Sequence, residues 1–173
     1  MAEIYQIGSG MIGQAMALDL AESHKIHLAD LNIKNVRKEI KDHPAIITYD
    51  LDVLNKKKLS SFIKKADIVL LAVPGYLGYS ALKTIISSGK NVVDISFSPE
   101  NIMKLNDIAI QNDVTAIFDA GVAPGLPNYI FGYHDSFEDI KSFKYYVGGL
   151  PKFPKKPFNY KAPFSPIDVI EEY

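Results

Sequence analysis

Three glycines near the N-terminus have the spacing of a phosphate-binding turn. Gly8, Gly10 and Gly13 lie between a short apolar run and a segment with helical periodicity. In such a unit the first glycine permits a tight turn, the second lets the backbone approach a pyrophosphate, and the third lets the helix pack close to the strand. The amide N–H groups at the helix start attract phosphate. A plain turn is the competing interpretation of the glycines alone. The expected cofactor residues here are Gly8, Ser9, Gly10, Met11, Ile12 and Gly13.

A carboxylate follows the second apolar run, at Asp30. In this position an acidic side chain can accept hydrogen bonds from the adenosine ribose of a dinucleotide. We count Leu31 with Asp30 among the cofactor residues. Neither Leu31 nor Asn32 carries a positive charge that could bind a 2′-phosphate. Arg37, the only arginine in the sequence, lies further along the next predicted helix. The pattern favours NAD over NADP. The alternative is that Asp30 caps that helix.

Other candidate residues follow the later apolar runs. Ligands of open parallel sheets bind beyond the carboxyl ends of the strands, so the segments after each strand are expected to meet at one edge. The expected cofactor contacts there are Asp50 and Leu51 at the adenine, and Val73, Pro74 and Gly75 after the fourth strand. Tyr76 to Tyr79 are expected to line a pocket, Ser96 and Phe97 to lie near the nicotinamide, and Asp119, Ala120 and Gly121 to close the ring.

Alternating strands and helices must position these residues. Short runs rich in β-branched residues alternate with longer amphipathic segments, which predicts an α/β fold with a Rossmann-type doubly wound parallel sheet. The predicted strands are Glu3 to Ile7, Lys25 to Ala29, Ile46 to Tyr49, Ile68 to Val73, Asn91 to Ile95 and Thr115 to Phe118. The predicted helices are Ile12 to Glu22, Ile33 to Lys41, Lys56 to Lys64, Gly78 to Ser88 and Pro99 to Asn112, the last with Ser98 as its N-cap.

The pattern changes after Gly121. A loop running into a short helix is expected first, and then a strand in "KSFKYYVGGLP" at 141–151. The rest of the chain is rich in proline and aromatic residues and has no room for a core of its own. We therefore expect an NAD-binding domain at 1–135 and, at 136–173, the truncated start of a second α/β domain for substrate binding and dimerisation.

Composition excludes several classes of function. The chain has 173 residues and a formal net charge of -1, so no excess of positive charge favours nucleic acid. No apolar run is long enough to span a membrane. The absence of cysteine fits a reducing compartment, the cytoplasm. The four histidines lack metal-ligand spacing, so no metal site is expected. With these classes excluded, the expected partner of the protein is a small molecule.

Four segments carry a resemblance to a known family. They are "GSGMIGQAMALDLA", "LLAVPGYLGYSALKTIISSGKNVVDISFSPE", "DAGVAPGLPNYIFG" and "YYVGGLPKFPKKPFNYKAPFSPIDVIEEY". Together they resemble the saccharopine dehydrogenase-like family, with lysine 6-dehydrogenases as its nearest branch. The resemblance implies an oxidoreductase that exchanges a hydride between a nicotinamide and the carbon of a C–N bond in an amino acid. It also implies a second α/β domain that builds the substrate pocket and the dimer interface, and hence a homodimer for the complete protein. The family continues well beyond Tyr173.

The resemblance also places residues on the two sides of the cofactor. Val73 to Gly75 correspond to the nicotinamide side, and Asp94, Ser96, Phe97 and Gly121 to the substrate side. Tyr76 and Tyr79, placed by their position after the fourth strand, are counted with the substrate side. Amine oxidation needs a neutral nitrogen before the hydride leaves, so a base must lie within reach. Asp119 is the candidate catalytic residue, and capping the turn before Gly121 is its alternative role. Two other hypotheses for the function of the chain remain. One is a non-catalytic dinucleotide-binding module or gene remnant, and the other is an enzyme for polyamine-type amines.

Overall fold

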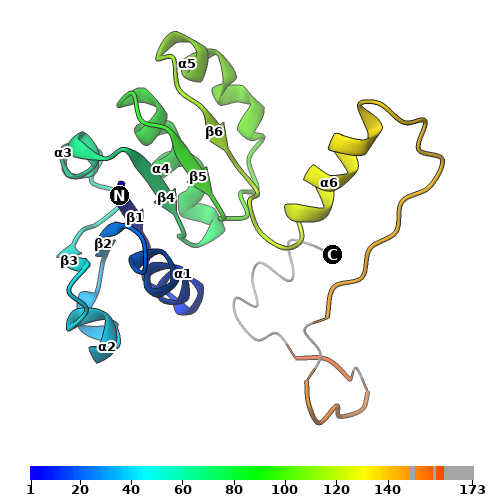
Figure 1. The fold of residues 1–173 in the computed structure, drawn as a ribbon, viewed down its shortest axis with the longest axis horizontal. Coiled ribbons are helices and arrows are strands. Elements are labelled where there is room, and N and C mark those ends of the chain that lie inside the picture. The colour runs from blue at the N-terminus through cyan, green and yellow to red at the C-terminus, as the bar shows by residue number, and fades with distance from the viewer. Residues whose placement is uncertain (149–150, 158, 162–173) are drawn as a thin grey trace. The chain divides into compact units, whose positions relative to one another are not determined.

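The computed structural model describes residues 1–148, 151–157 and 159–161. The chain divides into two compact units, Met1–Ala120 and Gly121–Tyr173. Figure 1 shows the sheet and its helices in the first unit and a single labelled helix in the second. The division falls before the predicted domain boundary at 135, so the helix after Gly121 belongs to the second unit.

The first unit is built on a six-stranded sheet with the order β3-β2-β1-β4-β5-β6. All five strand pairs are parallel. β1 and β4 lie side by side at the centre although two other strands separate them in sequence, which is the crossover of a doubly wound sheet. The strands are β1 (Glu3–Ile7), β2 (Lys25–Asp30), β3 (Ile46–Asp50), β4 (Ile68–Leu71), β5 (Val92–Asp94) and β6 (Ala116–Ile117).

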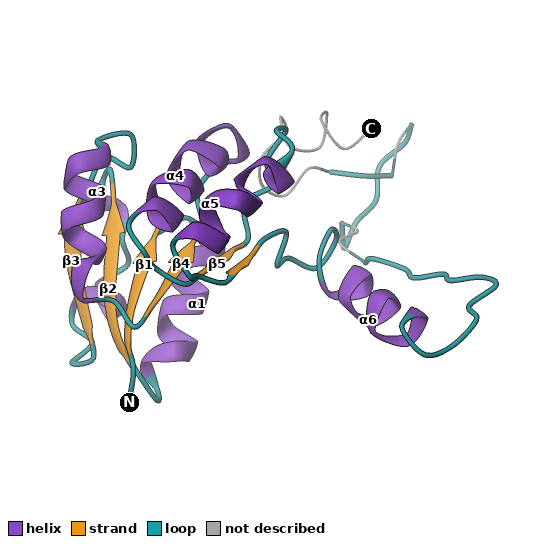
Figure 2. Ribbon diagram, turned by 90° about the horizontal axis from the view of Figure 1, so that it is seen from above, coloured by secondary structure: helices purple, strands orange, loops and turns teal. Residues whose placement is uncertain are grey.

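Helices cover both faces of this sheet, as the view in Figure 2 shows. The α-helices of the first unit are α1 (Met11–Ala21), α2 (Lys38–Lys41), α3 (Lys56–Phe62), α4 (Gly75–Ser87) and α5 (Asn106–Gln111). Three short 3-10 helices accompany them: η1 (Ile33–Asn35), η2 (Ile63–Lys65) and η3 (Ile102–Leu105). The predicted α/β class and doubly wound Rossmann fold are confirmed.

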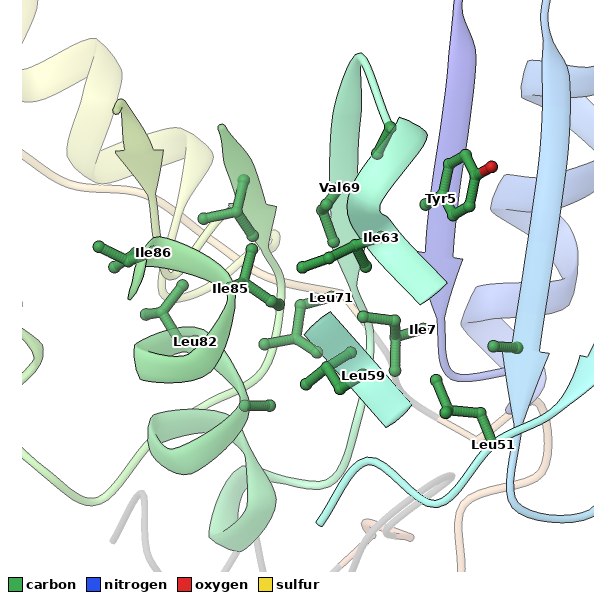
Figure 3. Close-up of a cluster of buried hydrophobic side chains, with 14 of the residues drawn as sticks. Tyr5, Ile7, Leu51, Leu59, Ile63, Val69, Leu71, Leu82, Ile85 and Ile86 are labelled. Atoms are coloured by element: carbon green, nitrogen blue, oxygen red, sulfur yellow. The ribbon is translucent and has the colours of Figure 1, made fainter. Parts of the chain in front are cut away.

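Two apolar layers hold the helices to the sheet. One layer joins α1 and α2 to alternate residues of the strands, including Ile4, Leu28 and Leu70. The other joins α3, α4 and η3 to the opposite face, with Leu71 and Leu82 fully buried in it (Figure 3). Burying each such side chain stabilises the fold by roughly 1.5–3 kcal/mol. The two layers fix the sheet between its helices and so fix the positions of the strand ends.

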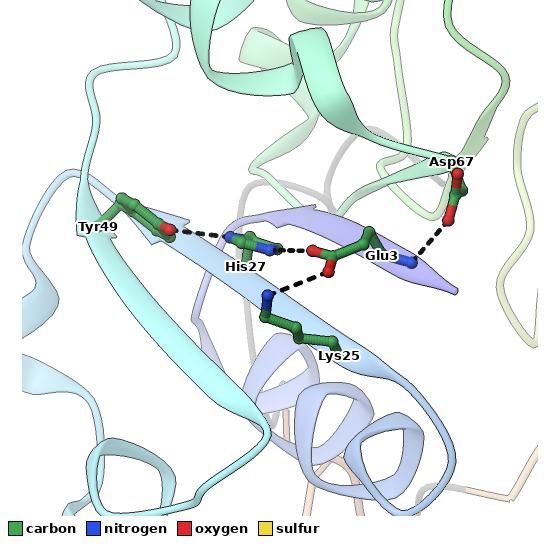
Figure 4. A network of polar contacts seen from close by, with 5 residues as sticks. All are labelled: Glu3, Lys25, His27, Tyr49 and Asp67. Atoms are coloured by element: carbon green, nitrogen blue, oxygen red, sulfur yellow. Dashed lines mark hydrogen bonds and ion pairs between the residues drawn. The ribbon is translucent and has the colours of Figure 1, made fainter. Parts of the chain in front are cut away.

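A polar network closes the amino ends of β1 and β2 (Figure 4). The Glu3 carboxylate contacts both His27 Nε2 and Lys25 Nζ, the latter at 3.0 Å. His27 also bonds through Nδ1 to the Tyr49 hydroxyl at 2.8 Å. The backbone N–H of Glu3 donates to the Asp67 carboxylate at 2.8 Å. These contacts tie the first residue of β1 to β2 and to Asp67 just before β4, and they link His27 of β2 to Tyr49 of β3.

The predicted helix at 33–41 is interrupted. Val36 and Arg37 have extended backbone, which separates η1 from α2. The backbone N–H of Arg37 donates to Gln14 Oε1 on α1 at 3.0 Å instead of to a carbonyl of its own segment. Because that bond replaces a helical one, a continuous helix cannot form through Arg37.

The predicted start of the helix at Pro99 is also wrong. The Ser98 hydroxyl donates to the Glu100 carboxylate at 2.7 Å and does not cap a helix. Asn101 is the cap, because its side chain accepts from the N–H of Met103 at 3.0 Å. The helical segment therefore begins as η3 at Ile102 and continues as α5.

The second unit contains α6 (Leu126–Asp135), where a short helix was predicted. Its start is fixed by the Asn128 side chain, which accepts from the N–H of Gly125 at 3.1 Å, and by a proline in the first turn. The strand predicted at 141–151 is not present in residues 141–148 or at Pro151. The intervening residues 149–150 lie outside the described part. A strand needs a hydrogen-bonded neighbour, and residues 141–148 pair with none of the described strands.

Candidate functional site

Backbone hydrogen bonds align the segments that leave the strands at their carboxyl ends. Each of these bonds runs from the first residues after one strand to the last residues of a neighbour, at 2.8 or 2.9 Å. They are Gly8 N to Ala29 O, Leu51 N to Asp30 O, Ala72 N to Ile7 O, Ile95 N to Leu71 O, and Ala120 N to Asp94 O. The structure thus brings the strand ends from β1 to β5 to one edge, as the sequence predicted.

The glycines of the turn divide into two kinds. Gly8 has a φ of +103°, and a Cβ there would collide with the carbonyl oxygen of Ala72. A Cβ on Gly13 would collide with the carbonyl oxygen of Gly8. Gly10 is different because a Cβ there would meet nothing within 4 Å. Gly8 and Gly13 are therefore required by the turn itself, whereas Gly10 borders open space that a ligand can fill.

Helix α1 begins at this turn with free donors. Gly10 is its N-cap, no side chain caps it, and its first turn holds no acidic residue. The first amide N–H groups of a helix have no intrahelical acceptor. Met11 and Ile12 expose 71% and 53% of their surface, so the first turn is accessible. This arrangement can bind a pyrophosphate through backbone N–H groups and the helix dipole.

Asp30 lies directly against the turn. Its Oδ2 accepts from the backbone N–H of Ser9 at 2.7 Å, and its Oδ1 accepts from that of Asn32 at 2.9 Å. No side chain caps η1, the helical segment that follows, so the alternative role of Asp30 as a helix cap is not observed. Leu31 is exposed. The carboxylate is thus tied to the glycine turn and has lone pairs left for ribose hydroxyls.

The single arginine of the sequence, Arg37, has two side-chain partners. Arg37 donates from Nε to Gln14 Oε1 at 3.3 Å, and its Nη1 contacts the Glu39 carboxylate at 2.7 Å. Gln14 in turn donates from Nε2 to the carbonyl oxygen of Ser9 at 2.8 Å. Arg37 is therefore bonded to Gln14 of α1 and to Glu39 of α2.

Two glutamines were missed by the sequence analysis. Besides Gln14, the buried Gln6 donates from Nε2 to the carbonyl oxygens of Gly8 and Gly13, at 3.0 and 2.6 Å. The available signal was its place in β1, a central strand in which an amide side chain interrupts apolar residues.

The remaining predicted cofactor residues have mixed surroundings. Asp50 is exposed at the end of β3, but Leu51 packs in the hydrophobic core and offers the site only its backbone. Val73 and Pro74 follow β4, and Gly75 begins α4, which starts earlier than predicted. Tyr76 is exposed, whereas Tyr79 packs against the core. A cavity of about 250 Å³ lies beside α4, α5 and β6, and no predicted site residue lines it.

A buried carboxyl lies at the end of β5. Asp94 Oδ1 accepts from the N–H and the hydroxyl of Ser96, at 2.8 and 2.6 Å. Its Oδ2 is buried without a hydrogen-bond partner among the described residues. Burial raises the pKa of Asp94 to about 6, and the nearby Asp119 adds to the rise. The Ser96 hydroxyl packs so close to α4 that a Cβ on Gly78 would overlap it.

Asp119 and Gly121 lie on the two sides of the division between the units. Asp119 is half-buried with a φ of 51°, and burial raises its pKa. Phe97 is half-buried after β5. Gly121 belongs to the second unit, where it pairs with Gly125 in an isolated bridge. The structure therefore places Asp94, Ser96 and Asp119 in one unit and Gly121 in the other.

The parallel strand order, the glycine turn and the carboxylate at the end of β2 define a dinucleotide-binding domain of the Rossmann type. A comparison with protein families narrows this class. The family "Saccharopine dehydrogenase NADP binding domain" matches residues 4–117. The chain belongs to this family, which confirms the resemblance at that level.

Named relatives support the assignment. The chain is 26% identical over 161 residues to alpha-aminoadipic semialdehyde synthase of Arabidopsis thaliana, covering 88% of this chain and 15% of the relative. It is 25% identical over 175 residues to saccharopine dehydrogenase [NADP(+), L-glutamate-forming] of Pyricularia oryzae, covering 96% and 39%. Apo saccharopine dehydrogenase (L-Glu forming) from Saccharomyces cerevisiae has the same fold, with a TM-score of 0.66, 21% identity and coverage of 79% and 31%. The chain thus spans about two fifths or less of these proteins.

Membrane spans and metal centres are absent from the described part of the chain. In the described ranges, none of the helices has both the length and the apolar character needed to cross a membrane. Within the same ranges, no group of three or more histidine or acidic residues is arranged to hold a metal ion.

Proposed function

We propose that the chain binds NAD at the turn from Gly8 to Gly13 and is the cofactor-binding part of an oxidoreductase that acts on the C–N bond of an amino acid. One observation carries the cofactor proposal: Asp30, at the end of β2, is hydrogen bonded to the turn at Ser9. In this position the carboxylate reaches the adenosine ribose while the start of α1 binds the pyrophosphate.

The choice of NAD over NADP rests on charge. A 2′-phosphate on the adenosine ribose would lie beside the Asp30 carboxylate, and like charges at such a distance repel. Neither Leu31 nor Asn32 can neutralise it, and Arg37 is bonded to Gln14 and Glu39. The fungal relatives carry NADP(+) in their names. In this respect we expect the chain to differ from them.

The substrate side is proposed from the strand ends nearer β5. Val73 to Gly75 would border the nicotinamide, and Asp94, Ser96 and Phe97 the amine substrate. Asp119 is the proposed base that takes a proton from the substrate ammonium, since a neutral nitrogen is needed before its carbon gives a hydride to the nicotinamide. The resulting imine is hydrolysed to a carbonyl compound and ammonia or an amine.

A calorimetric titration with NAD tests the cofactor proposal. We expect binding to wild type and its loss in Gly10→Val, because the new side chain would fill the space beside the turn, where a Cβ meets no protein atom within 4 Å. Gly132→Val on α6 is the matched control, since a Cβ there also meets nothing within 4 Å. Unchanged NAD affinity in a folded Gly10→Val variant would refute the site.

Two further experiments address activity. NADH formation from lysine by the 173-residue chain would eliminate the alternative of a non-catalytic binding module or gene remnant. Comparing turnover of lysine with turnover of diamines, in a protein of full family length, separates an amino-acid enzyme from the polyamine alternative. For that complete protein we propose a homodimer in the cytoplasm, to be checked by analytical ultracentrifugation and cell fractionation.

A further inference from the structure

Gln6 occupies a position that is otherwise apolar. It lies in β1 between β2 and β4, where its register partners are Leu28 and Leu70. These leucines and Ile4 belong to the apolar layer beneath α1, and the Gln6 side chain is fully buried. Burying an amide costs free energy unless its hydrogen bonds are restored. The hydrogen bonds that Gln6 makes must therefore offset the cost of burying its amide.

Those bonds span the glycine turn. Nε2 uses both of its hydrogens, one toward the carbonyl oxygen of Gly8 at 3.0 Å and one toward that of Gly13 at 2.6 Å. The same nitrogen would lie 3.1 Å from a Cβ on Gly13, so the amide fills the space next to this glycine. One side chain thus connects the first residue of the turn with the first turn of α1.

The oxygen of the Gln6 amide shows that this side chain is not optimised for stability. Gln6 Oε1 is buried and has no hydrogen-bond partner among the described residues. An apolar side chain of similar length would avoid that cost, so stability alone does not account for glutamine here. What the amide specifically supplies is a fixed direction for the Gly8 and Gly13 carbonyls.

Gln14 completes the arrangement from the outer side. Its Nε2 donates to the carbonyl oxygen of Ser9 at 2.8 Å. The carbonyls of Gly8, Ser9 and Gly13 are thereby turned toward side-chain amides of the protein. The peptide units of the turn are held in one orientation, and the first N–H groups of α1 keep no protein acceptor of their own.

We propose that Gln6 is a positioning residue for the cofactor, whose buried amide holds the glycine turn in the shape that directs the N–H groups of α1 to the pyrophosphate. This inference rests on the proposed binding of NAD. Gln6 itself does not touch the cofactor, because its side chain is enclosed beneath the turn.

The test uses Gln6→Met, which keeps the length of the side chain and removes the donor. In the 173-residue chain we expect NAD affinity to fall about tenfold, the value of one net hydrogen bond. The affinity for adenosine, measured by NMR titration, should stay unchanged because adenosine lacks the pyrophosphate. Ile26→Val is the matched control. Ile26 is fully buried in the same apolar layer, and its side chain has no polar atom that could bond to the turn.

A second measurement on wild type does not depend on the variant's folding. The side-chain amide protons of Gln6 should exchange slowly with solvent, and their resonances should shift when NAD is added. Equal NAD affinity in wild type and folded Gln6→Met, or Gln6 resonances that NAD leaves unchanged, would overturn the role of Gln6 while the NAD site stands. Absence of NAD binding by wild type would instead overturn the proposed function and, with it, this inference.

Discussion

The two ends of the parallel strands hold their carboxyl groups in opposite ways. At the amino end, hydrogen bonds from His27 and Lys25 lower the pKa of Glu3 (Figure 4). At the carboxyl end, burial raises the pKa of Asp94 to about 6. The first carboxylate stabilises the fold through its partners, whereas the second is kept in the protein at a cost.

Buried side-chain atoms that lack a hydrogen-bond partner also lie near the carboxyl ends of the strands. Among the described residues, the buried side-chain atoms without a hydrogen-bond partner are Gln6 Oε1 and Asp94 Oδ2. Both residues lie in the last two positions of their strands, beside the segments where a cofactor would bind. Such local costs concentrate at functional sites, where geometry for a ligand takes precedence over stability. Unpartnered buried atoms at the carboxyl edge and paired side chains at the amino edge indicate that the first edge is adapted to binding and the second to stability.

The largest expected effect comes from removing the tight turn itself. Gly8→Ala should lower the free energy of unfolding by about 3 kcal/mol or more, because the Cβ collides with the Ala72 carbonyl at a positive φ. Gly10→Ala should cost about 1 kcal/mol at most. Urea denaturation of both variants measures this. Equal stability of the two would show that the turn has no steric requirement at Gly8.

Asp94 should give the next largest effect. Its folded pKa of about 6 lies above the ordinary aspartate pKa of 3.8, so the folded state binds the proton more tightly than the unfolded state. This contribution to stability is complete below about pH 4 and is lost as the pH rises through 6, in total about 3 kcal/mol. The difference in unfolding free energy between wild type and Asp94→Asn should change by that amount between pH 4 and pH 7. A pH-independent difference would contradict the burial of the charge.

Glu3 should show the smallest effect, with the opposite sign. Its pKa is lowered in the fold, so its contribution is present above its unfolded pKa and is lost as the pH falls through the folded value. Wild type should therefore exceed Glu3→Gln in melting temperature at pH 7, with the gap closing toward pH 3. NAD affinity should be the same in both proteins. A clear loss of NAD affinity in Glu3→Gln would break the distinction between the two edges.

Much of the fold could be predicted because its signals are local. Alternation of short apolar runs with amphipathic segments located the strands of the sheet to within a few residues, and the glycine spacing located the turn. The break at Arg37 could not be predicted, because it depends on a bond to Gln14 from another helix. The start of the helix at Ile102 depends on which of two neighbouring side chains, Ser98 or Asn101, finds a backbone N–H.

The site was predictable to a smaller extent. The position of Asp30 against the turn followed from its place at the end of the second strand. Leu51 comes directly after the third strand, yet its side chain lies in the core, because a place near a strand end does not fix side-chain direction. Gln6 was missed because a polar residue in a strand ordinarily indicates an exposed face. Only the packing on both faces of β1 reveals that it is buried.

We propose above that the carboxylate of Asp30 selects NAD over NADP at the glycine turn. The most direct test is a calorimetric titration of the 173-residue chain with NAD and with NADP under identical conditions. We expect NAD to bind at least about tenfold more tightly, since the 2′-phosphate would lie beside the Asp30 carboxylate and neither Leu31 nor Asn32 carries a positive charge. Equal or tighter binding of NADP would contradict it.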